Sequence, residues 1–338
     1  MAVSLVRDAI AGYAIEIADL TARRGRPVVV DEARVADRSG AMALKAPGVW
    51  SPNRSCRIVR AADGWIAVNL PREADRWAVP AWIGCKLDAD PWRAIIRGAR
   101  TRRWRDLVDQ AARLGLPACG VGEAAAPGGD GLVRMAEGAT EPLRAAPKVL
   151  DLSSLWAGPL CGALLARAGC EVTKLESLGR PDVLRDSAPA MFHDLNAGKT
   201  HARLDFTDAG DVARLCDLIS GADVVITSAR PRAFEQFGMP PREAFARNPR
   251  LVWVAVSGYG WMGPGADRVA FGDDAAAAGG LVRWTRQGEP RFLGDALADP
   301  LTGLFAARGA LRALARGGGF LVDAAMAQAS ARAAVSCR

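Results

Sequence analysis

Histidine and tyrosine are scarce in this chain, with two of each among 338 residues. Its seven cysteines form no C-x-x-C pair. With His193 and His201 as the only imidazoles, a Cys/His zinc site is disfavoured and no metal is expected. Widely spaced cysteines are typical of a reducing compartment, so the sequence predicts a cytoplasmic protein.

Long apolar runs are also missing. No uncharged stretch approaches the ~20 residues that a membrane-spanning helix needs, and Asp8, Glu16 and Asp19 interrupt any signal-peptide core. The net charge is +7, but the arginines are scattered, whereas nucleic-acid-binding proteins concentrate charge on one element or face. We therefore expect neither a membrane nor a nucleic acid as partner. A modest positive field would suit a polyanionic small molecule such as a nucleotide cofactor.

Several catalytic motifs are absent. There is no G-x-S-x-G elbow, no G-x-G-x-x-G fingerprint and no complete P-loop. The stretch "NAGKT" (residues 196–200) matches only the tail of a P-loop, and it precedes a predicted strand instead of a helix. Neither histidine lies in the context of a catalytic triad, so each is expected to be structural or at the surface.

The patterns that are present divide the chain into two regimes. Up to residue 126 the sequence predicts a helix, two short strands joined by a turn, and a second helix that ends at Gly115. From Lys148 onward, apolar strands alternate with helices, which is typical of an α/β fold with a parallel sheet. The predicted parts are an N-terminal helical and connecting segment (1–45), a small α+β domain (46–126), a linker (127–147) and a Rossmann-like domain (148–338).

The first strand-to-helix junction of the second regime is "LDLSSLWAGPLCG" (residues 150–162). Free amides at a helix N-terminus attract phosphate, and ligands of such folds lie at the carboxyl ends of the strands. A nucleotide site is one interpretation of this junction. A tight turn with close helix packing, which the Gly158-to-Gly162 spacing explains equally well, is the other.

A second junction is "ADPLTGLFAARGALRAL" (residues 298–314). Asp followed by Pro is a preferred start of a helix, so the local pattern favours Asp299 as an N-cap. The charged form of a carboxylate is stabilised there, and an anionic carboxylate at a sheet end can also act as a nucleophile. Both roles remain open from the local sequence.

Five stretches taken in order resemble the family III CoA transferases, a group that includes formyl-CoA transferase, carnitine-CoA transferases and α-methylacyl-CoA racemase. The stretches are "KVLDLSSLWAGPLCGALLARAGCEVTKLE", "NAGKTHARLDF", "ADVVITSARPRAFEQFGM", "NPRLVWVAVSGYGWMGPGADRVAFGDDAAAAGG" and "ADPLTGLFAARGALRAL". The resemblance covers residues 148–326. It implies a Rossmann-like CoA-binding domain, a smaller domain and an interlocked homodimer.

The resemblance also implies an activity, acyl-CoA:carboxylate CoA transfer through a covalent aspartyl intermediate. The family's D-x-x-x-G pattern falls on Asp299 and Gly303, whereas Asp295 lacks a glycine four residues later. Coenzyme A enters as acyl-CoA, and a carboxylic acid is the acceptor. The implied CoA contacts are Ser154, Leu155, Trp156, Ala157, Lys174, Ser228, Ala229, Arg230 and Phe271, with Arg180, Arg230 and Arg232 meeting the phosphates.

This sequence departs from the family pattern at several points. Ser177 and Ser228 stand where formyl-CoA transferase has Arg and Asn, and Phe271 stands where the racemases have their histidine, which disfavours racemisation. "SGAMAL" (39–44) and later N-terminal stretches resemble segments that normally follow the Asp-bearing region. The chain therefore resembles a permuted transferase, or one section of a longer tandem protein.

Three interpretations of the function follow. The first is an active transferase, the second a CoA-binding partner subunit without catalysis, and the third a racemase, lyase or hydrolase on the same scaffold. The substrate is not specified by these motifs. Tryptophans such as Trp156 and Trp261 are candidates for an apolar acyl pocket, although most tryptophans belong to the core.

Overall fold

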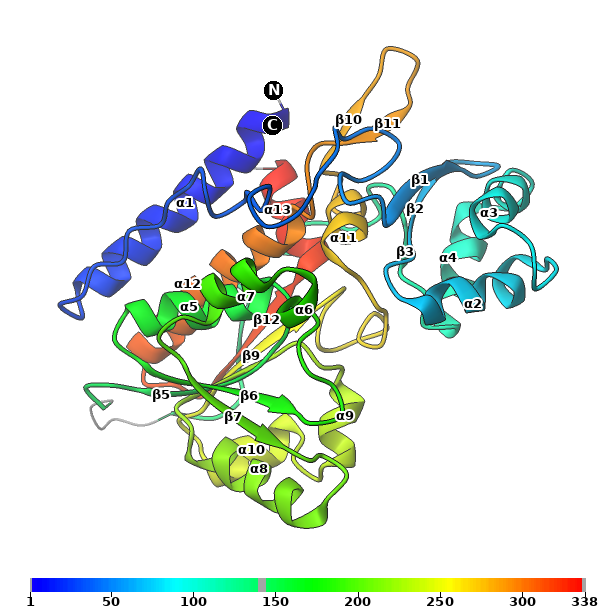
Figure 1. Cartoon of the computed structure of the whole chain (residues 1–338). Coiled ribbons are helices and arrows are strands. Elements are labelled where there is room, and N and C mark those ends of the chain that lie inside the picture. Colours follow the sequence, from blue (N-terminus) through cyan, green and yellow to red (C-terminus); the bar gives the residue numbers. More distant parts are fainter. Residues whose placement is uncertain (1, 139–143, 336–338) are drawn as a thin grey trace.

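The computed structural model describes residues 2–138 and 144–335. Its main body is a seven-stranded sheet in the order β4-β12-β9-β8-β5-β6-β7 (Figure 1). All neighbours pair in parallel except β4, which is antiparallel to β12. The strands are β4 (Leu132–Arg134), β5 (Lys148–Leu152), β6 (Glu171–Ser177), β7 (Thr200–Leu204), β8 (Val224–Thr227), β9 (Val252–Ser257) and β12 (Phe320–Ala325).

Helices cover both faces of this sheet, because successive strand residues point to opposite sides. Val224 and Ile226 of β8 pack in the core beneath one helical layer, while Val225 between them packs in the core of the other. The first layer contains α1 (Ala2–Ala22), α5 (Ala157–Arg167), α6 (Leu184–Ser187), α7 (Pro189–Asn196), α12 (Ala298–Ala315) and α13 (Met326–Val335). The second contains α8 (Ala209–Gly221), α9 (Pro231–Gln236) and α10 (Pro241–Arg247).

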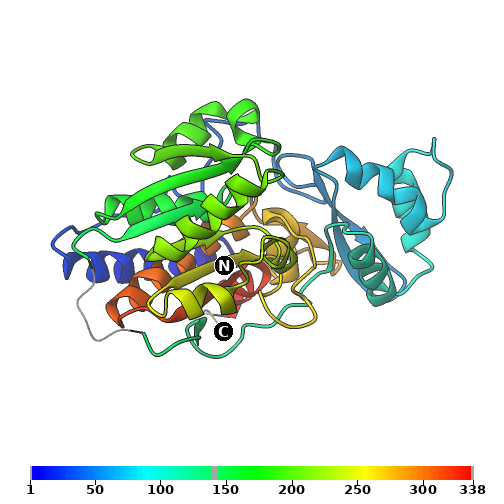
Figure 2. The same cartoon turned by 90° about the horizontal axis from the view of Figure 1, so that it is seen from below.

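A smaller unit stands to one side of the main body in both views (Figures 1 and 2). It has an antiparallel sheet of β1 (Cys56–Arg60), β2 (Trp65–Asn69) and β3 (Ala118–Gly120), and its own apolar core. Its helices are α2 (Glu73–Ile83), α3 (Pro91–Ala99) and α4 (Trp104–Arg113).

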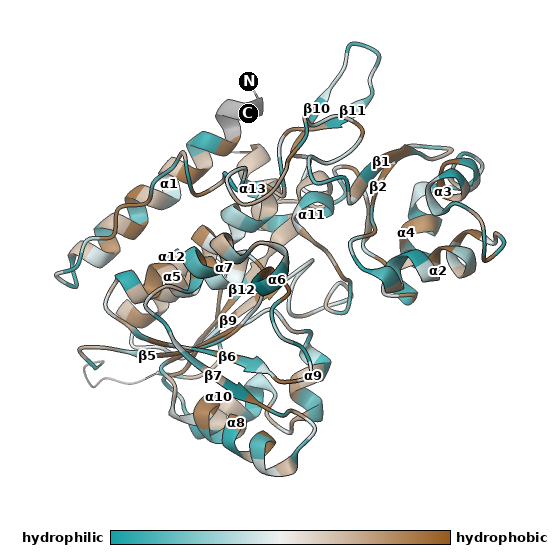
Figure 3. Cartoon of the chain, viewed as in Figure 1, coloured by the Kyte–Doolittle hydropathy of each residue, from teal (hydrophilic) through white to brown (hydrophobic). Residues whose placement is uncertain are grey.

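The small unit joins the main body at α11 (Gly272–Ala278), where Ala277 and Ala278 share a buried cluster with Cys56 and Cys119. Next to α11 lies a two-stranded hairpin of β10 (Val282–Trp284) and β11 (Pro290–Phe292). Its projecting loop is mainly hydrophilic in colour (Figure 3). Contacts at α11 therefore connect the small unit to the layer that carries α12.

The predicted α/β class with a parallel sheet is confirmed. Two segments differ from the predicted boundaries. Helix α1, assigned to a separate N-terminal segment, packs in the main core through Ile10 and Ile17, and the predicted linker contributes the edge strand β4. No helix within the described residues is long and apolar enough to cross a membrane.

Candidate active site

The main cleft lies where the strand order reverses. From β5 the chain runs to β6 and β7 on one side of the sheet, whereas β8, β9 and β12 lie on the other. The loops after β5 and β8 separate at this point, which is where doubly wound sheets hold ligands. The Ser154 amide donates a 3.1 Å hydrogen bond to Ser228 Oγ across the gap. Both residues line a cleft of about 520 Å³.

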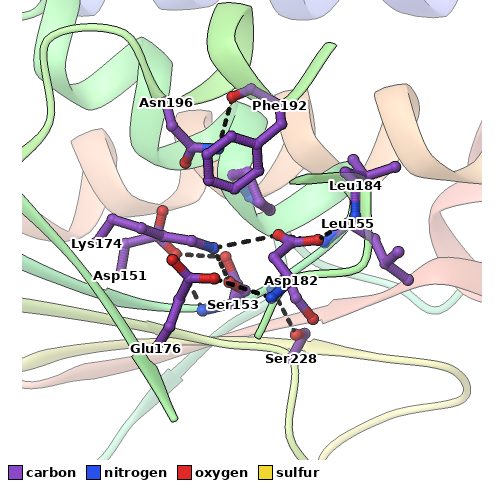
Figure 4. Close-up of polar contacts among 12 residues, drawn as sticks. Asp151, Ser153, Leu155, Lys174, Glu176, Asp182, Leu184, Phe192, Asn196 and Ser228 are labelled. Atoms are coloured by element: carbon purple, nitrogen blue, oxygen red, sulfur yellow. Dashed lines mark hydrogen bonds and ion pairs between the residues drawn. The ribbon is translucent and has the colours of Figure 1, made fainter. Parts of the chain in front are cut away.

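Leu155 has an unusual backbone, with φ at 68° in the left-handed region that favours glycine. Its amide donates to Asp182 Oδ2 at 3.0 Å, which holds the loop in this conformation. Lys174 Nζ lies 3.5 Å from the same oxygen and also donates to the Ser153 carbonyl (Figure 4). A backbone held in a strained region by surrounding contacts is common at binding sites.

The predicted CoA contact of Lys174 does not agree with this arrangement. Its side chain is fully buried, lies beneath the Ser153–Leu155 loop and does not line the cleft. Burying the ammonium beside Asp182 makes Lys174 part of the support of the loop. Trp156 also faces away from this cleft, into a second cavity described below.

Helix α12 does not begin as the sequence pattern predicted. Its N-cap is Leu297, and Asp299 lies inside the first turn with Pro300 after it. The N-cap assignment of Asp299 is therefore wrong, because the chain enters the helix two residues earlier. Ala296, just before this turn, has φ at 44°, and its amide donates to Asp273 Oδ1 at 2.8 Å.

Two glycines permit the position of Asp299. A Cβ added at Gly272 would overlap Asp299 Oδ2 and lie 2.7 Å from Ala296 Cβ, so only glycine fits against the carboxylate. A Cβ at Gly303 would lie 2.8 Å from the carbonyl oxygen of Ala157. The glycine of the D-x-x-x-G pattern thus allows α12 to pack closely on α5 and brings Asp299 to the cleft wall.

Asp299 is half-buried, and burial raises its pKa to about 7. The charge of Arg38 and the backbone amide of Ala157 lower the pKa, while the carboxylates of Asp273 and Asp295 raise it. This outcome contradicts the expectation that the helix N-terminus keeps Asp299 firmly ionised. Desolvation outweighs the charge of Arg38 and the hydrogen bond from Ala157, so the carboxyl titrates near neutrality.

Asp295 has a different environment. Arg38 pairs with it through two nitrogens, Nε to Oδ2 and NH2 to Oδ1, the latter at 3.0 Å. Its side chain is 9% exposed, and it does not line the cleft. Burial lowers the pKa of Arg38. The hydrogen bond to Asp295 and the charge of Asp295 raise it by more, so the pKa lies above its usual value. Asp295 is therefore neutralised by Arg38, whereas Asp299 opens into the cleft.

Arginines surround the rest of the cleft. Arg180, Arg230 and Arg232, predicted to meet phosphates, line it together with Arg72 and Arg268. Burial lowers the pKa of Arg230, and the charges of Arg232, Arg72 and Arg180 lower it further. Such mutual repulsion shows an excess of positive charge, which an anionic ligand would relieve.

The cleft brings together most of the residues predicted from the sequence. All of the predicted contacts except Trp156 and Lys174 line it, namely Ser154, Leu155, Ala157, Ser228, Ala229, Arg230, Phe271 and Asp299. Sequence reasoning missed Arg72 and Arg268, which line the cleft, and Arg38, which pairs with Asp295 and acts on Asp299. Arg38 and Arg72 lie outside the recognised motifs, and Arg268 lies at a motif position without an assigned role, so only the folded chain brings them to the site. Neither His193 nor His201 is among the lining residues. In the described parts of the chain, no group of His, Cys, Asp or Glu is arranged to hold a metal ion.

The model of CoA-transferase family III matches residues 146–336, more than half of the chain. The chain therefore belongs to this family. It is 36% identical over 200 residues to an acyl-CoA transferase of Fusarium pseudograminearum, covering 53% of this chain and 44% of that protein. It is 34% identical over 176 residues to succinyl-CoA–D-citramalate CoA-transferase of Chloroflexus aurantiacus, covering 49% and 44%.

A solved structure shows the same relationship. A CAIB/BAIF family protein from Brucella suis matches with a TM-score of 0.52 and 29% identity over 56% of this chain and 55% of that one. The chain spans about half the length of the curated relatives it matches. The region that the family model matches carries the parallel strands β5 to β9 and β12 together with Asp299.

Proposed function

We propose that this chain is an acyl-CoA:carboxylate CoA transferase in which Asp299 is the nucleophile. The observation that carries the proposal is the opening of the half-buried Asp299 carboxylate into the same cleft as Arg180, Arg230 and Arg232. The cleft thus combines an excess of positive charge for the phosphates of CoA with a nucleophile for its thioester. The CoA-transferase activities named for the relatives support the same reaction class.

The proposed reaction begins when an Asp299 oxygen attacks the thioester carbonyl of the donor acyl-CoA. The carbon–sulfur bond breaks, which gives a mixed anhydride and CoA thiolate. The thiolate then attacks the Asp299 carbonyl carbon of the anhydride, so that the donor acid leaves and an aspartyl-CoA thioester forms. An acceptor carboxylate repeats both steps in reverse, and Asp299 is regenerated as the carboxylate.

The surroundings of Asp299 fit a nucleophile of this kind. With a pKa of about 7, roughly half of the carboxyl groups are ionised at neutral pH. Burial and the neighbouring carboxylates of Asp273 and Asp295 raise the free energy of the anion, which favours its attack on the thioester. The Ala157 amide, which lowers the pKa of Asp299, is the donor placed to stabilise an oxyanion.

The CoA site is assigned to the two loops at the strand-order reversal. Ser154, Leu155 and Ala157 form one wall, and Ser228, Ala229 and Arg230 form the other. The phosphates of CoA would meet the arginine cluster, to which Arg72 adds a charge from the small unit. Phe271, also in the wall, replaces the histidine of the racemase branch, and this argues for transfer over racemisation.

A trapping experiment tests the chemistry. The protein is incubated with acetyl-CoA, treated with hydroxylamine or borohydride, digested and analysed by mass spectrometry. We expect a modified Asp299 peptide in the wild type and none in Asp299→Ala, with CoA binding retained in both. No adduct across a broad panel of acyl-CoAs, together with normal CoA binding, would instead identify a partner subunit without catalysis.

Three further parts of the proposal concern the whole protein. An interlocked homodimer is carried over from the family resemblance, and light scattering in solution tests it. A cytoplasmic location is supported by the free cysteines, which are Cys56, Cys85, Cys119, Cys161, Cys170 and Cys216 in the described residues. The proposed division keeps a small domain at 46–126 and a main domain at 148–338, with α1 and β4 packed on the main domain.

A further inference from the structure

A second cavity of about 420 Å³ lies on the other side of the first turn of α5. Segment 34–41 forms one wall and α7 forms another. Its buried lining consists of the apolar side chains Trp156, Leu160, Met191 and Leu195, together with the charged, largely buried side chain of Arg38. Charged side chains, including the 3.0 Å ion pair of Arg34 with Asp194, are exposed at its rim.

This cavity approaches the nucleophile from behind the main cleft. Trp156 lines the second cavity, and the next residue, Ala157, lines the main cleft and has its amide against Asp299. Leu160 also lines the second cavity and contacts the site of Gly303, one turn beyond Asp299. The two hollows thus adjoin at the start of α5, where Trp156 lines one and Ala157 lines the other.

Arg38 connects the two hollows electrostatically. Its guanidinium carbon lies 5.2 Å from the centroid of the Trp156 ring, and its charge acts on Asp299. The residue lines the second cavity while it is paired with Asp295. An acyl group attached at Asp299 would therefore find a cation and an indole ring in the direction of the apolar cavity.

We infer that the second cavity holds the apolar chain of the transferred acyl group, and that the substrates are monocarboxylic acids with an aliphatic tail. This inference rests on the proposed reaction at Asp299. A tail among Leu160, Met191 and Leu195 gains by leaving water, about fourfold in affinity for each buried methylene group. The distal carboxylate of a dicarboxylic acyl group would instead be desolvated against the same side chains, because Arg38, the largely buried cation of this cavity, is already paired with Asp295.

The test compares the binding of free CoA, acetyl-CoA, succinyl-CoA and octanoyl-CoA by calorimetry. If three methylene groups enter the cavity, octanoyl-CoA binds the wild type about 60-fold more tightly than acetyl-CoA. Ala41→Trp fills the cavity from segment 34–41 and should remove most of this preference while free CoA binds unchanged. Ala43→Trp is the matched control, because Ala43 is exposed and outside the cavity walls, and it should retain the preference.

A second variant keeps the inference testable if Ala41→Trp fails to fold. Met191→Ala enlarges the cavity and should move the tightest binding from octanoyl-CoA to a longer chain. The inference is overturned if octanoyl-CoA binds within about twofold of acetyl-CoA, since that would mean that no methylene group is buried. It is equally overturned if succinyl-CoA binds most tightly, or if both tryptophan variants lose the preference alike.

The experiments distinguish an incorrect transferase mechanism from an incorrect assignment of the second cavity. Tight octanoyl-CoA binding that Ala41→Trp abolishes, without any trapped adduct, supports the cavity and rejects the transferase mechanism. An Asp299 adduct from acetyl-CoA with no preference for chain length rejects the cavity and supports the mechanism.

Discussion

Replacing Asp299 with Asn should stabilise the fold at pH 8 while it abolishes the trapped adduct. The Asp299 carboxylate lies near the carboxylates of Asp273 and Asp295, and the Arg38 side chain is hydrogen-bonded to Asp295. Burial raises its pKa from 3.8 to about 7, so the ionised group is unfavourable in the folded state. Asparagine has nearly the same shape and carries no charge.

The size of the effect follows from proton linkage. A pKa shift of roughly three units, at about 1.4 kcal/mol each, gives an upper limit of ~4 kcal/mol. Because Asp299 is half-buried and keeps some contact with water, we expect a gain of about 2–3 kcal/mol in the free energy of unfolding. Between pH 4 and 7 the folded state binds the proton that the unfolded state has released, so wild-type stability falls as pH rises through this window. The gain from Asn is thus small near pH 4 and complete above pH 7.

Urea denaturation at pH 4.5 and pH 8 measures this difference. Asp217→Asn on the exposed face of α8 is the control for the loss of one negative charge. A variant that is no more stable than the wild type at pH 8, or equally stabilised at both pH values, would refute the assignment of a desolvated anion to Asp299.

Three further outcomes are expected. If the ionised Asp299 is the attacking form, kcat/KM for acyl transfer should rise about tenfold between pH 6 and pH 8, with a midpoint near 7 in a pH–rate profile. Gly303→Ala places a Cβ 2.8 Å from the Ala157 carbonyl oxygen and should cost about 1–3 kcal/mol in urea unfolding, whereas Gly12→Ala in the exposed part of α1, with open space around it, should stabilise by up to ~1 kcal/mol. Lys174→Met leaves Asp182 buried without its cation, so it should cost about 3–5 kcal/mol of stability by the same assay and weaken CoA binding through the loosened loop.

The strand–helix alternation after Lys148 was predictable because the strands of a parallel sheet with both faces covered are short apolar runs. The runs "KVLDL", "EVTKLE", "DVVITS" and "LVWVAVSGYG" are of this kind, and they contain β5, most of β6, β8 and β9. Strand β12 was missed, since its apolar run directly follows a glycine stop and precedes another helix. Strand β4 has three residues and no marked pattern, and it exists because β12 offers it a pairing edge.

The candidate site was predictable in part for the same reason. Residues such as Ser154 and Ser228 directly follow strands, and parallel strands bring their carboxyl ends to one edge. The protonation of Asp299 was not predictable, because the opposing carboxylate of Asp273 and the cation of Arg38 are 26 and 261 positions away in the sequence. The local sequence indicates that Asp299 lies near a helix N-terminus, but it does not indicate the burial of the carboxylate, which raises its pKa.

The region that matches the family model and the rest of the chain contribute different parts of this site. Residues 146–336 contain the proposed nucleophile, the two loops and most of the arginines. Arg72 and the cavity wall at 34–41 lie before the matched region, and in the proposed site they add charge at the phosphate end and shape at the acyl end. Substrate choice should therefore depend on residues that the family pattern does not identify. Filling this wall with Ala41→Trp would then change the chain-length preference, while the reaction at Asp299 would stay the same.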